Sequence, residues 1–197
     1  MKIIGAIIAG GKSSRMGGEE KAFLTLSGKS ILDLVIGRFD QQVDRVVINA
    51  NGNGQRFSDT GLQVVPDIMT TLTTPLAGLH ASLRFARNAD FLVTVPSDTP
   101  FLPLDLVSRL VETAQDGGAA IAHSGGQEHY VIGAWKAELL TDLEKAIQKE
   151  GLFRVKDWAR HVSAGIVTWP HLPYDPFFNL NTPDDLKRAE NIVRANS

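Results

Sequence analysis

The sequence predicts one α/β domain of the doubly wound type, with a mostly parallel sheet covered by helices on both faces. Short apolar runs rich in β-branched residues alternate along the chain with longer segments that have apolar residues at helical spacing. The 197 residues suit one domain, and no repeat, low-complexity tract or linker divides them. We therefore expect residues 1–197 to form a single domain.

The predicted strands are mostly continuous apolar runs, which are typical of parallel strands buried on both faces. They are Ile3–Ile8, Arg45–Asn49, Leu62–Val65, Ala89–Val95, Ala119–His123, Tyr130–Trp135 and Gly165–Val167. Folds of this class bind ligands at the carboxyl ends of their strands. The loops in which to look for chemistry therefore follow Ile8, Ile48, Val65 and Val95.

The predicted helices carry an apolar stripe or a clear start signal. They are Ser30–Arg38, Pro75–Arg87, Leu104–Ala114, Lys136–Glu150 and Phe153–His161. A last helix begins at Thr182, an N-cap residue that is followed by proline and two acidic residues. In contrast, Ala9–Gly18 is so rich in glycine and serine that we predict a loop without regular structure.

Composition excludes several classes of function. A formal net charge of −2 without any basic excess argues against binding along a nucleic-acid backbone. The chain has no cysteine, which excludes disulfides and thiolate metal sites and fits a cytoplasmic protein. No apolar run approaches the roughly 20 residues of a membrane span, so we expect no membrane insertion.

The loop from Ala9 to Lys21 is a candidate phosphate-binding site. Glycines allow a close approach of the backbone to a ligand, and exposed N–H groups can surround phosphate oxygens. Arg15 and Lys21 add the positive charge that an anion requires. The glycines are Gly10, Gly11, Gly17 and Gly18. Their spacing matches neither a Walker A loop nor G-x-G-x-x-G, and a surface loop without a ligand is the alternative.

Several oxygen-bearing side chains follow predicted strands or precede the last helix. Asp98 comes just after the fourth strand, where a carboxylate could hold Mg²⁺ for a phosphate substrate. Asn181 could add a neutral oxygen ligand, and the alternative for both residues is capping of the turn or helix that follows. Asn49 and Asp67 stand at strand ends, where they could bind a base or ribose or could be turn residues.

His129 follows two glycines between two predicted strands and could face a substrate, although a solvent-exposed histidine is the alternative. No pair of the five histidines has the i, i+4 spacing of a metal site. The sequence has neither a G-x-S-x-G elbow nor a cysteine nucleophile, so covalent hydrolase chemistry is unsupported.

In combination, these segments resemble the molybdenum cofactor guanylyltransferase family. The loop from Ile8 to Lys21 is similar to the signature L-A-G-G-x-S-x-R-M-G-x-D-K. Four further motifs, N-A-N, P-L-A-G, D-T-P and N-x-N-T-P, stand at Asn49–Asn51, Pro75–Gly78, Asp98–Pro100 and Asn179–Pro183. The chain departs from the family pattern at Glu20 (usually Asp), Thr74 (usually Gly) and Tyr130 (commonly Pro).

The resemblance implies a Rossmann-like nucleotidyltransferase fold and transfer of GMP from GTP to molybdenum-molybdopterin, with release of pyrophosphate. The implied nucleotide-binding residues are Ile8, Ala9, Gly10, Gly11, Lys21, Asn49, Asp67 and Asp98. The resemblance implies that Lys21 contacts the phosphates and that Asp98 carries Mg²⁺; with the residue reasoning above, the expected catalytic residues are Arg15, Lys21 and Asp98 and the expected Mg²⁺ ligands are Asp98 and Asn181. The implied residues for the pterin substrate are His129, Asn179 and Asn181.

GTP and molybdopterin would be the small-molecule partners, and transient contacts with cofactor-biosynthesis proteins or acceptor molybdoenzymes could occur. The second glycine of Ala9-Gly10-Gly11 favours GTP, because CTP-using relatives tend to have Ala-Ala-Gly there. The alternatives are a CTP-dependent molybdopterin cytidylyltransferase, a sugar-phosphate nucleotidyltransferase, a nucleotide-binding module without turnover and a non-enzymatic interaction domain. Nucleotide preference and pyrophosphate release would separate them.

Overall fold

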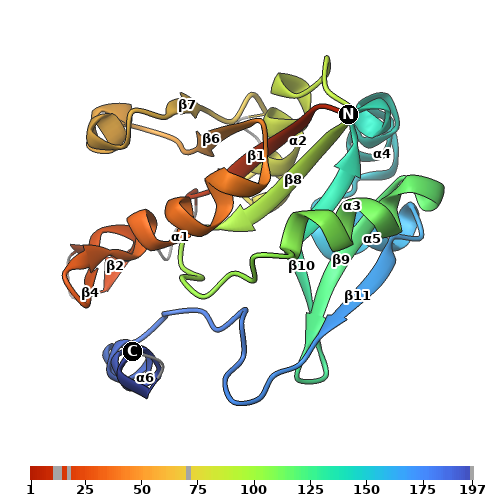
Figure 1. The fold of residues 1–197 in the computed structure, drawn as a ribbon. Helices are drawn as coiled ribbons and strands as arrows, with labels where there is room; N and C mark the ends of the chain where they lie inside the picture. Colours follow the sequence, from red (N-terminus) through yellow and green to blue (C-terminus); the bar gives the residue numbers. More distant parts are fainter. Residues whose placement is uncertain (11–14, 17–18, 70–71, 196–197) are drawn as a thin grey trace.

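A seven-stranded sheet forms the centre of the molecule in a computed structural model that describes residues 1–10, 15–16, 19–69 and 72–195 (Figure 1). The order across the sheet is β11-β9-β10-β8-β1-β6-β7. These strands are β1 Ile3–Ile8, β6 Arg45–Asn49, β7 Gln63–Val65, β8 Phe91–Pro96, β9 Ala119–Ser124, β10 Gln127–Lys136 and β11 Gly165–Trp169. Within this sheet β10 alone runs antiparallel to its neighbours, so the predicted mostly parallel sheet is confirmed.

Helices cover both faces of the sheet, as the sequence predicts. They are α1 Ile31–Phe39, α2 Pro75–Phe85, α3 Leu106–Gly117, α4 Leu140–Glu150, α5 Val155–His161 and α6 Pro183–Ala195. The helices α1 and α3 pack on one face, whereas α2, α4 and α5 pack on the other (Figure 1). No helix in the described part of the chain is both long and apolar enough to cross a membrane.

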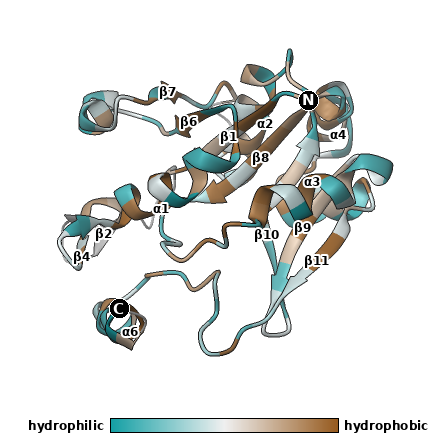
Figure 2. Ribbon diagram, in the orientation of Figure 1, coloured by the Kyte–Doolittle hydropathy of each residue, from teal (hydrophilic) through white to brown (hydrophobic). Residues whose placement is uncertain are grey.

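The two central strands are apolar along their length because both of their faces are buried. In β1, Ile4, Ala6 and Ile8 pack with the cluster under α2, α4 and α5, while Ile7 packs under α1 and α3. Figure 2 shows the same hydrophobic colouring along β1 and β8. Continuous apolar runs therefore identify these strands correctly, since alternation is expected only where one face is solvated.

The strand order reverses between the parallel strands β1 and β8, which is the switch point at which folds of this class bind ligands. From β1 the chain proceeds to β6 and β7 on one side, then returns to place β8 on the other side. Loops that leave two adjacent parallel strands in opposite directions open a crevice beyond the strand ends. Here the Ser97 N–H, just after β8, donates to the Ile8 carbonyl at 3.2 Å. We call this side of the sheet the carboxyl edge. It also carries the end of β9 and the start of β10.

Several short elements differ from the sequence prediction. The prediction that Ala9–Gly18 lacks regular structure is wrong in part, because β2 Arg15–Met16 pairs antiparallel with β3 Glu19–Glu20. Other short elements have no counterpart in the sequence prediction: the hairpin β4 Thr25–Leu26 and β5 Lys29–Ser30, and the 3-10 turns η1 Lys21–Phe23, η2 Asp40–Gln42, η3 Gly54–Thr60 and η4 Ala137–Leu139. The helix predicted from Lys136 begins only at Leu140, because β10 continues through Lys136.

A third apolar cluster attaches α6 to the rest of the molecule. It contains Leu26, Ile31, Phe101, Leu180 and Ala189. These residues come from the β4–β5 hairpin, the start of α1, the loop after β8 and the C-terminal segment. Through this cluster the last helix packs against the loop that carries Asp98.

The predicted N-cap of α6 is confirmed. The Asp185 N–H donates to the Thr182 hydroxyl oxygen at 3.2 Å, and the Asp185 carboxylate accepts from the Thr182 N–H at 2.8 Å. The carboxylate also accepts from the Asn181 N–H at 3.0 Å. Burial raises the pKa of Asp185, but these hydrogen bonds outweigh it and hold the pKa below its usual value.

Candidate active site

Asn49, at the end of β6, joins three segments of the carboxyl edge. Its backbone carbonyl accepts from the Ala9 N–H at 2.8 Å, which fixes the start of the glycine-rich loop. Its side-chain Nδ2 donates to the Val65 carbonyl at 3.0 Å and to the Asp67 carboxylate at 2.9 Å. The Asn49 side chain is buried and its Nδ2 is used in these two bonds. Its amide oxygen Oδ1 is the atom that faces Gly10 and Gly78.

Asp67 is held in a fixed orientation by a second amide. Asn51 Nδ2 donates to the other carboxylate oxygen of Asp67 at 2.6 Å, and the Asp67 N–H donates back to Asn51 Oδ1 at 2.9 Å. Asp67 is half-buried and Asn51 is exposed. The pair therefore presents an oriented carboxylate and an amide at the carboxyl edge, and such groups can bind the N–H or O–H groups of a base or ribose.

Two glycines leave room around Asn49. A Cβ atom on Gly10 would lie 3.8 Å from Asn49 Oδ1, whereas a Cβ on Gly78 of α2 would lie only 2.2 Å from it. Gly78 thus allows α2 to pack directly on the end of β6. Thr74, where the family motif has glycine, has extended backbone before α2, and its hydroxyl donates to the Phe153 carbonyl. Thr74 therefore fits this position without a left-handed conformation.

Asp98 lies in the loop after β8, next to the crevice, and one of its carboxylate oxygens is shielded from solvent. The Leu180 N–H donates to the Asp98 carbonyl at 3.1 Å. Leu180 is fully buried, while its neighbours Asn179 and Asn181 are exposed. Both amides therefore lie on the solvent side of the segment that passes Asp98, so the structure brings these three predicted residues together.

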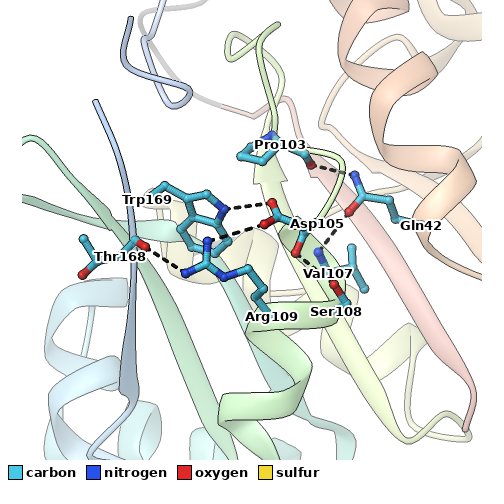
Figure 3. Close-up of polar contacts among 8 residues, drawn as sticks. All are labelled: Gln42, Pro103, Asp105, Val107, Ser108, Arg109, Thr168 and Trp169. Atoms are coloured by element: carbon cyan, nitrogen blue, oxygen red, sulfur yellow. Dashed lines mark hydrogen bonds and ion pairs between the residues drawn. The ribbon is translucent and has the colours of Figure 1, made fainter. Parts of the chain in front are cut away.

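Polar contacts from two directions hold the loop between β8 and α3 (Figure 3). Gln42, after α1, donates to the Pro103 carbonyl at 2.9 Å and accepts from the Val107 N–H at 3.0 Å. On the other side, Asp105 accepts from the Trp169 indole at 2.9 Å and pairs with Arg109 at 3.5 Å. Since Asp98 belongs to this loop, α1, α3 and β11 together position it.

His129 lies near the start of β10, on the same edge as Asp98. Its Nε2 is 2.8 Å from the hydroxyl of Ser124, which also lies 2.7 Å from the carboxylate of Asp175. The His129 ring packs on Phe177 at 5.0 Å between ring centroids. Burial lowers the pKa of His129; Asp175 raises it, and His123 lowers it further. His129 is therefore a half-buried imidazole whose surroundings favour the neutral form, rather than a freely solvated surface histidine.

Some predicted residues are described in part or not at all. Gly11 lies outside the described residues, and only the backbone is described for Arg15 and Lys21. The backbone of Arg15 belongs to β2, and that of Lys21 begins η1. Ile8, Ala9 and Gly10 lie at the mouth of the crevice, as the fold prediction requires.

Three residues of the candidate site, Gly78, Ser124 and Asp175, are not among those predicted from the sequence. The P-L-A-G motif contains Gly78, so a signal for it existed. Ser124 and Asp175 are 51 residues apart in the chain, and Asp175 lies in an irregular segment. No local pattern could have paired them.

The oxygen donors at this edge suit a hard cation that is shared with a phosphate substrate. Asp98 offers a carboxylate, and the amide-bearing residues Asn179 and Asn181 flank Leu180, whose N–H donates to the Asp98 carbonyl. No group of three or more His, Asp or Glu side chains suited to a metal occurs within residues 1–10, 22–69 and 72–195, where side chains are described. Mg²⁺ typically binds one or two carboxylates plus substrate phosphates rather than a complete protein cage, so the residues present fit Mg²⁺.

Comparison with known proteins identifies the family. A family profile described as MobA-like NTP transferase domain matches residues 5–164. The molybdenum cofactor guanylyltransferase of Bradyrhizobium sp. (strain ORS 278) is 41% identical over 195 residues, which cover 96% of this chain and 92% of the relative. The enzyme of the same name from Brucella ovis is also 41% identical, over 207 residues that cover 98% of this chain and 94% of the relative.

Solved structures share the fold. The crystal structure of molybdopterin-guanine dinucleotide biosynthesis protein A from Archaeoglobus fulgidus superimposes with a TM-score of 0.73 at 24% identity, covering 99% of this chain and 100% of that chain. A nucleotidyl transferase from Methanothermobacter gives a TM-score of 0.77 at 18% identity, covering 100% and 99%. The chain is thus a nucleotidyltransferase with a Rossmann-like fold, and it belongs to the molybdenum cofactor guanylyltransferase family.

Proposed function

We propose that this protein transfers GMP from GTP to molybdenum-molybdopterin, giving the guanine dinucleotide form of the cofactor and pyrophosphate. The observation that carries the proposal is the gathering of Ala9, Asn49, Asp67 and Asp98 around one crevice at the carboxyl edge. The near full-length relatives named molybdenum cofactor guanylyltransferase support the choice of substrates. The reaction would take place in the cytoplasm.

The two substrates would occupy opposite ends of the carboxyl edge. Ile8, Ala9, Gly10 and Gly11 would bind the nucleotide through their backbone, and Asn49 and Asp67 would bind base or ribose groups. His129, Asn179 and Asn181 would line the acceptor side. Asp98 lies between these two groups of residues, because it is bonded to Leu180 on one side and adjoins the Ile8–Ser97 contact on the other. The α-phosphate would therefore lie near Asp98.

The reaction itself needs positioning and charge neutralisation more than proton transfer. An oxygen of the acceptor's terminal phosphate attacks the α-phosphorus of GTP, a new P–O bond forms, and the bond to the bridging oxygen of pyrophosphate breaks. Pyrophosphate leaves with that electron pair, and the attacking phosphate is already ionised. Arg15, Lys21 and the loop N–H groups would offset the charge of the triphosphate. Asp98 and Asn181 would hold Mg²⁺, which supplies further neutralisation and orients the phosphate oxygens.

Thermal unfolding with GTP, CTP, ATP and UTP, each with Mg²⁺ or chelator, tests nucleotide choice first. A ligand at 100 times its Kd stabilises the folded state by about 2.7 kcal/mol, which is several degrees for a domain of this size. We expect a Mg²⁺-dependent shift that is selective for GTP. Selectivity for CTP would instead indicate a cytidylyltransferase, and no shift with any nucleotide would contradict the enzymatic proposal.

Replacement of Asp98 tests the metal role. We expect Asp98→Asn to lower turnover on the order of 10²-fold or more and to remove the Mg²⁺-dependent part of the GTP shift. Asp116→Asn is the matched control, because Asp116 is exposed near the end of α3, which leads into the start of β9 on the side of the sheet opposite the carboxyl edge. Pyrophosphate release is the measurement. Near-normal activity of Asp98→Asn would show that Asp98 does not hold the metal.

A further inference from the structure

A buried serine connects His129 to a carboxylate at the turn between β9 and β10. Ser124 is the last residue of β9 and is fully buried. Its hydroxyl oxygen lies 2.8 Å from His129 Nε2 and 2.7 Å from Asp175 Oδ1. The same Asp175 oxygen accepts from the Phe177 N–H at 2.9 Å. The four residues form one continuous set of hydrogen bonds, which we call the Ser124 relay.

The direction of each hydrogen bond in the relay follows from the donors available. An ionised carboxylate only accepts, so the single hydroxyl hydrogen of Ser124 points to Asp175. The Ser124 oxygen can then only accept from His129, and Nε2 must carry a hydrogen. In a neutral imidazole the other nitrogen, Nδ1, is consequently left with a lone pair.

Packing fixes the plane of the imidazole as well as its tautomer. The ring of Phe177 lies 5.0 Å from that of His129, and Phe177 is in turn wedged edge-on against Trp169 at 5.3 Å. His129 Nδ1 forms no hydrogen bond with the part of the chain whose side chains are described, and it is not among the solvent-shielded atoms there. Nδ1 is therefore accessible to solvent, on a residue that lies at the carboxyl edge.

We propose that Ser124 and Asp175 are positioning residues that hold His129 in the tautomer with hydrogen on Nε2, so that Nδ1 accepts a hydrogen bond from an N–H or O–H group of the acceptor substrate. The identity of that acceptor rests on the proposed function. The tautomer does not, because it follows from the relay alone.

The surroundings of His129 favour its neutral form. Burial outweighs the nearby Asp175 carboxylate and lowers the pKa of His129, and His123 on β9 lowers it further. His123 itself contacts the Thr168 hydroxyl at 3.2 Å, on β11. An imidazolium would carry hydrogens on both nitrogens. Its Nδ1 could then no longer accept a hydrogen bond and would repel the N–H or O–H donor of the substrate. Acceptor binding should therefore weaken as the pH falls through the pKa of His129.

Nitrogen-15 NMR of the histidine side chains tests the tautomer without any substrate. The His129 signals are assigned by their loss in His129→Gln. We expect the unmodified protein to show Nε2 protonated and Nδ1 unprotonated above neutral pH. Ser124→Ala should move both signals towards the averaged values of a histidine that exchanges tautomers. A protonated Nδ1 in the unmodified protein, or an unchanged spectrum in Ser124→Ala, overturns the proposal.

The Asp175→Asn variant removes the charge of the carboxylate but keeps an oxygen that can accept the Ser124 hydrogen bond, so it tests the two effects separately. The asparagine oxygen should keep accepting from Ser124 and Phe177, because the alternative orientation would set an NH₂ group against the Phe177 N–H. We expect this variant to retain the Nε2 tautomer and to lower the pKa of His129 further, since it removes the carboxylate. Loss of the tautomer in Asp175→Asn would contradict the relay.

Kinetics then tests the acceptor contact. We expect Ser124→Ala to raise the KM for the acceptor about 3- to 10-fold, the size of one weakened hydrogen bond, with the KM for GTP unchanged. Equal rises in both KM values would show a purely structural role and overturn the proposal. Failure of the unmodified protein to release pyrophosphate would instead contradict the proposed function, whereas the NMR result would still decide the tautomer.

Discussion

Gly78 shows how one missing Cβ atom can determine the packing at a candidate binding site. A Cβ there would lie 2.2 Å from Asn49 Oδ1, and Asn49 is fixed by its bonds to Val65 and Asp67. A glycine inside a helix costs roughly 1 kcal/mol relative to alanine. The chain therefore gives up helix stability at this position for close packing of α2 on β6.

A glycine-to-alanine substitution inside a helix usually stabilises a protein, and we expect Gly78→Ala to destabilise it instead. We expect it to displace Asn49, to raise the KM for the nucleotide roughly tenfold and to lower the free energy of unfolding, because at least one buried hydrogen bond of about 1 kcal/mol is lost. Gly37→Ala in α1 is the control, since nothing lies within 4 Å of its Cβ. We expect Gly37→Ala to raise the free energy of unfolding and to leave the KM for the nucleotide unchanged. Equal behaviour of both variants in urea unfolding would contradict the explanation.

The lowered pKa of His129 also predicts how stability depends on pH. Between this lowered pKa and the usual value of 6.5, the unfolded chain binds more protons than the folded chain at this residue. The contribution of His129 to the free energy of unfolding is therefore complete above about pH 6.5, and it is lost as the pH falls through the folded-state pKa of His129.

Urea unfolding from pH 8 to pH 5 measures this contribution by comparison with His129→Gln. The difference in free energy of unfolding between the two proteins should change in favour of the variant as the pH falls. A constant difference would mean that the pKa of His129 is not lowered by folding.

At the residue scale, the sequence predicts which residues gather at the ends of parallel strands better than it predicts contacts made by irregular segments. Asn49 ends a parallel strand, Asp67 and Asp98 follow parallel strands, and a parallel sheet necessarily aligns the ends of its strands. The contact between Ser124 and Asp175 depends on the path of an irregular segment, which no periodic pattern records.

The elements themselves were predictable where they are long. The run Arg45–Asn49 is a strand with the predicted bounds, and α2 begins at Pro75 as predicted. The β4–β5 hairpin was missed although Ser27-Gly28 is a turn signal, and both residues have positive φ, as a tight hairpin turn requires. Elements of two residues are too short to show a period.

The capping box of α6 has a measurable energy. We expect Thr182→Ala to lower the free energy of unfolding by about 1 kcal/mol, because the first turn of α6 loses its side-chain acceptor. Thr141→Ala, at an exposed site in the first turn of α4, is the control and should leave stability unchanged or raise it slightly, because alanine has the higher helix propensity. Urea unfolding checks both variants. An equal loss in the two would show that the cap does not stabilise α6.

At the scale of the whole molecule, α6 is part of the same folding unit as the sheet. The family profile ends at residue 164, but Leu180 and Ala189 share a buried cluster with Leu26, Ile31 and Phe101. The segment between β11 and α6 also bonds to Ser124 and to Asp98 on its way. These contacts support the prediction of a single domain over residues 1–197.

Scanning calorimetry tests that prediction. We expect one transition whose calorimetric and van't Hoff enthalpies agree, because α6 cannot separate without exposing the cluster at Phe101. Bound nucleotide should shift the temperature of this one transition without dividing it into two. An earlier transition for α6 alone would contradict a single cooperative domain.

The reversed direction of β10 has a consequence for how this scaffold can be altered. Antiparallel strands can be joined by two residues, whereas parallel strands need a long crossover. Here Gly125 and Gly126, with φ values of 53° and 80°, make that short connection beside Asp175. Insertions at this turn would enlarge the proposed acceptor side while leaving every crossover helix in place. Protein engineers could therefore vary the size of the proposed acceptor site at the Gly125–Gly126 turn and leave the proposed nucleotide-binding residues untouched.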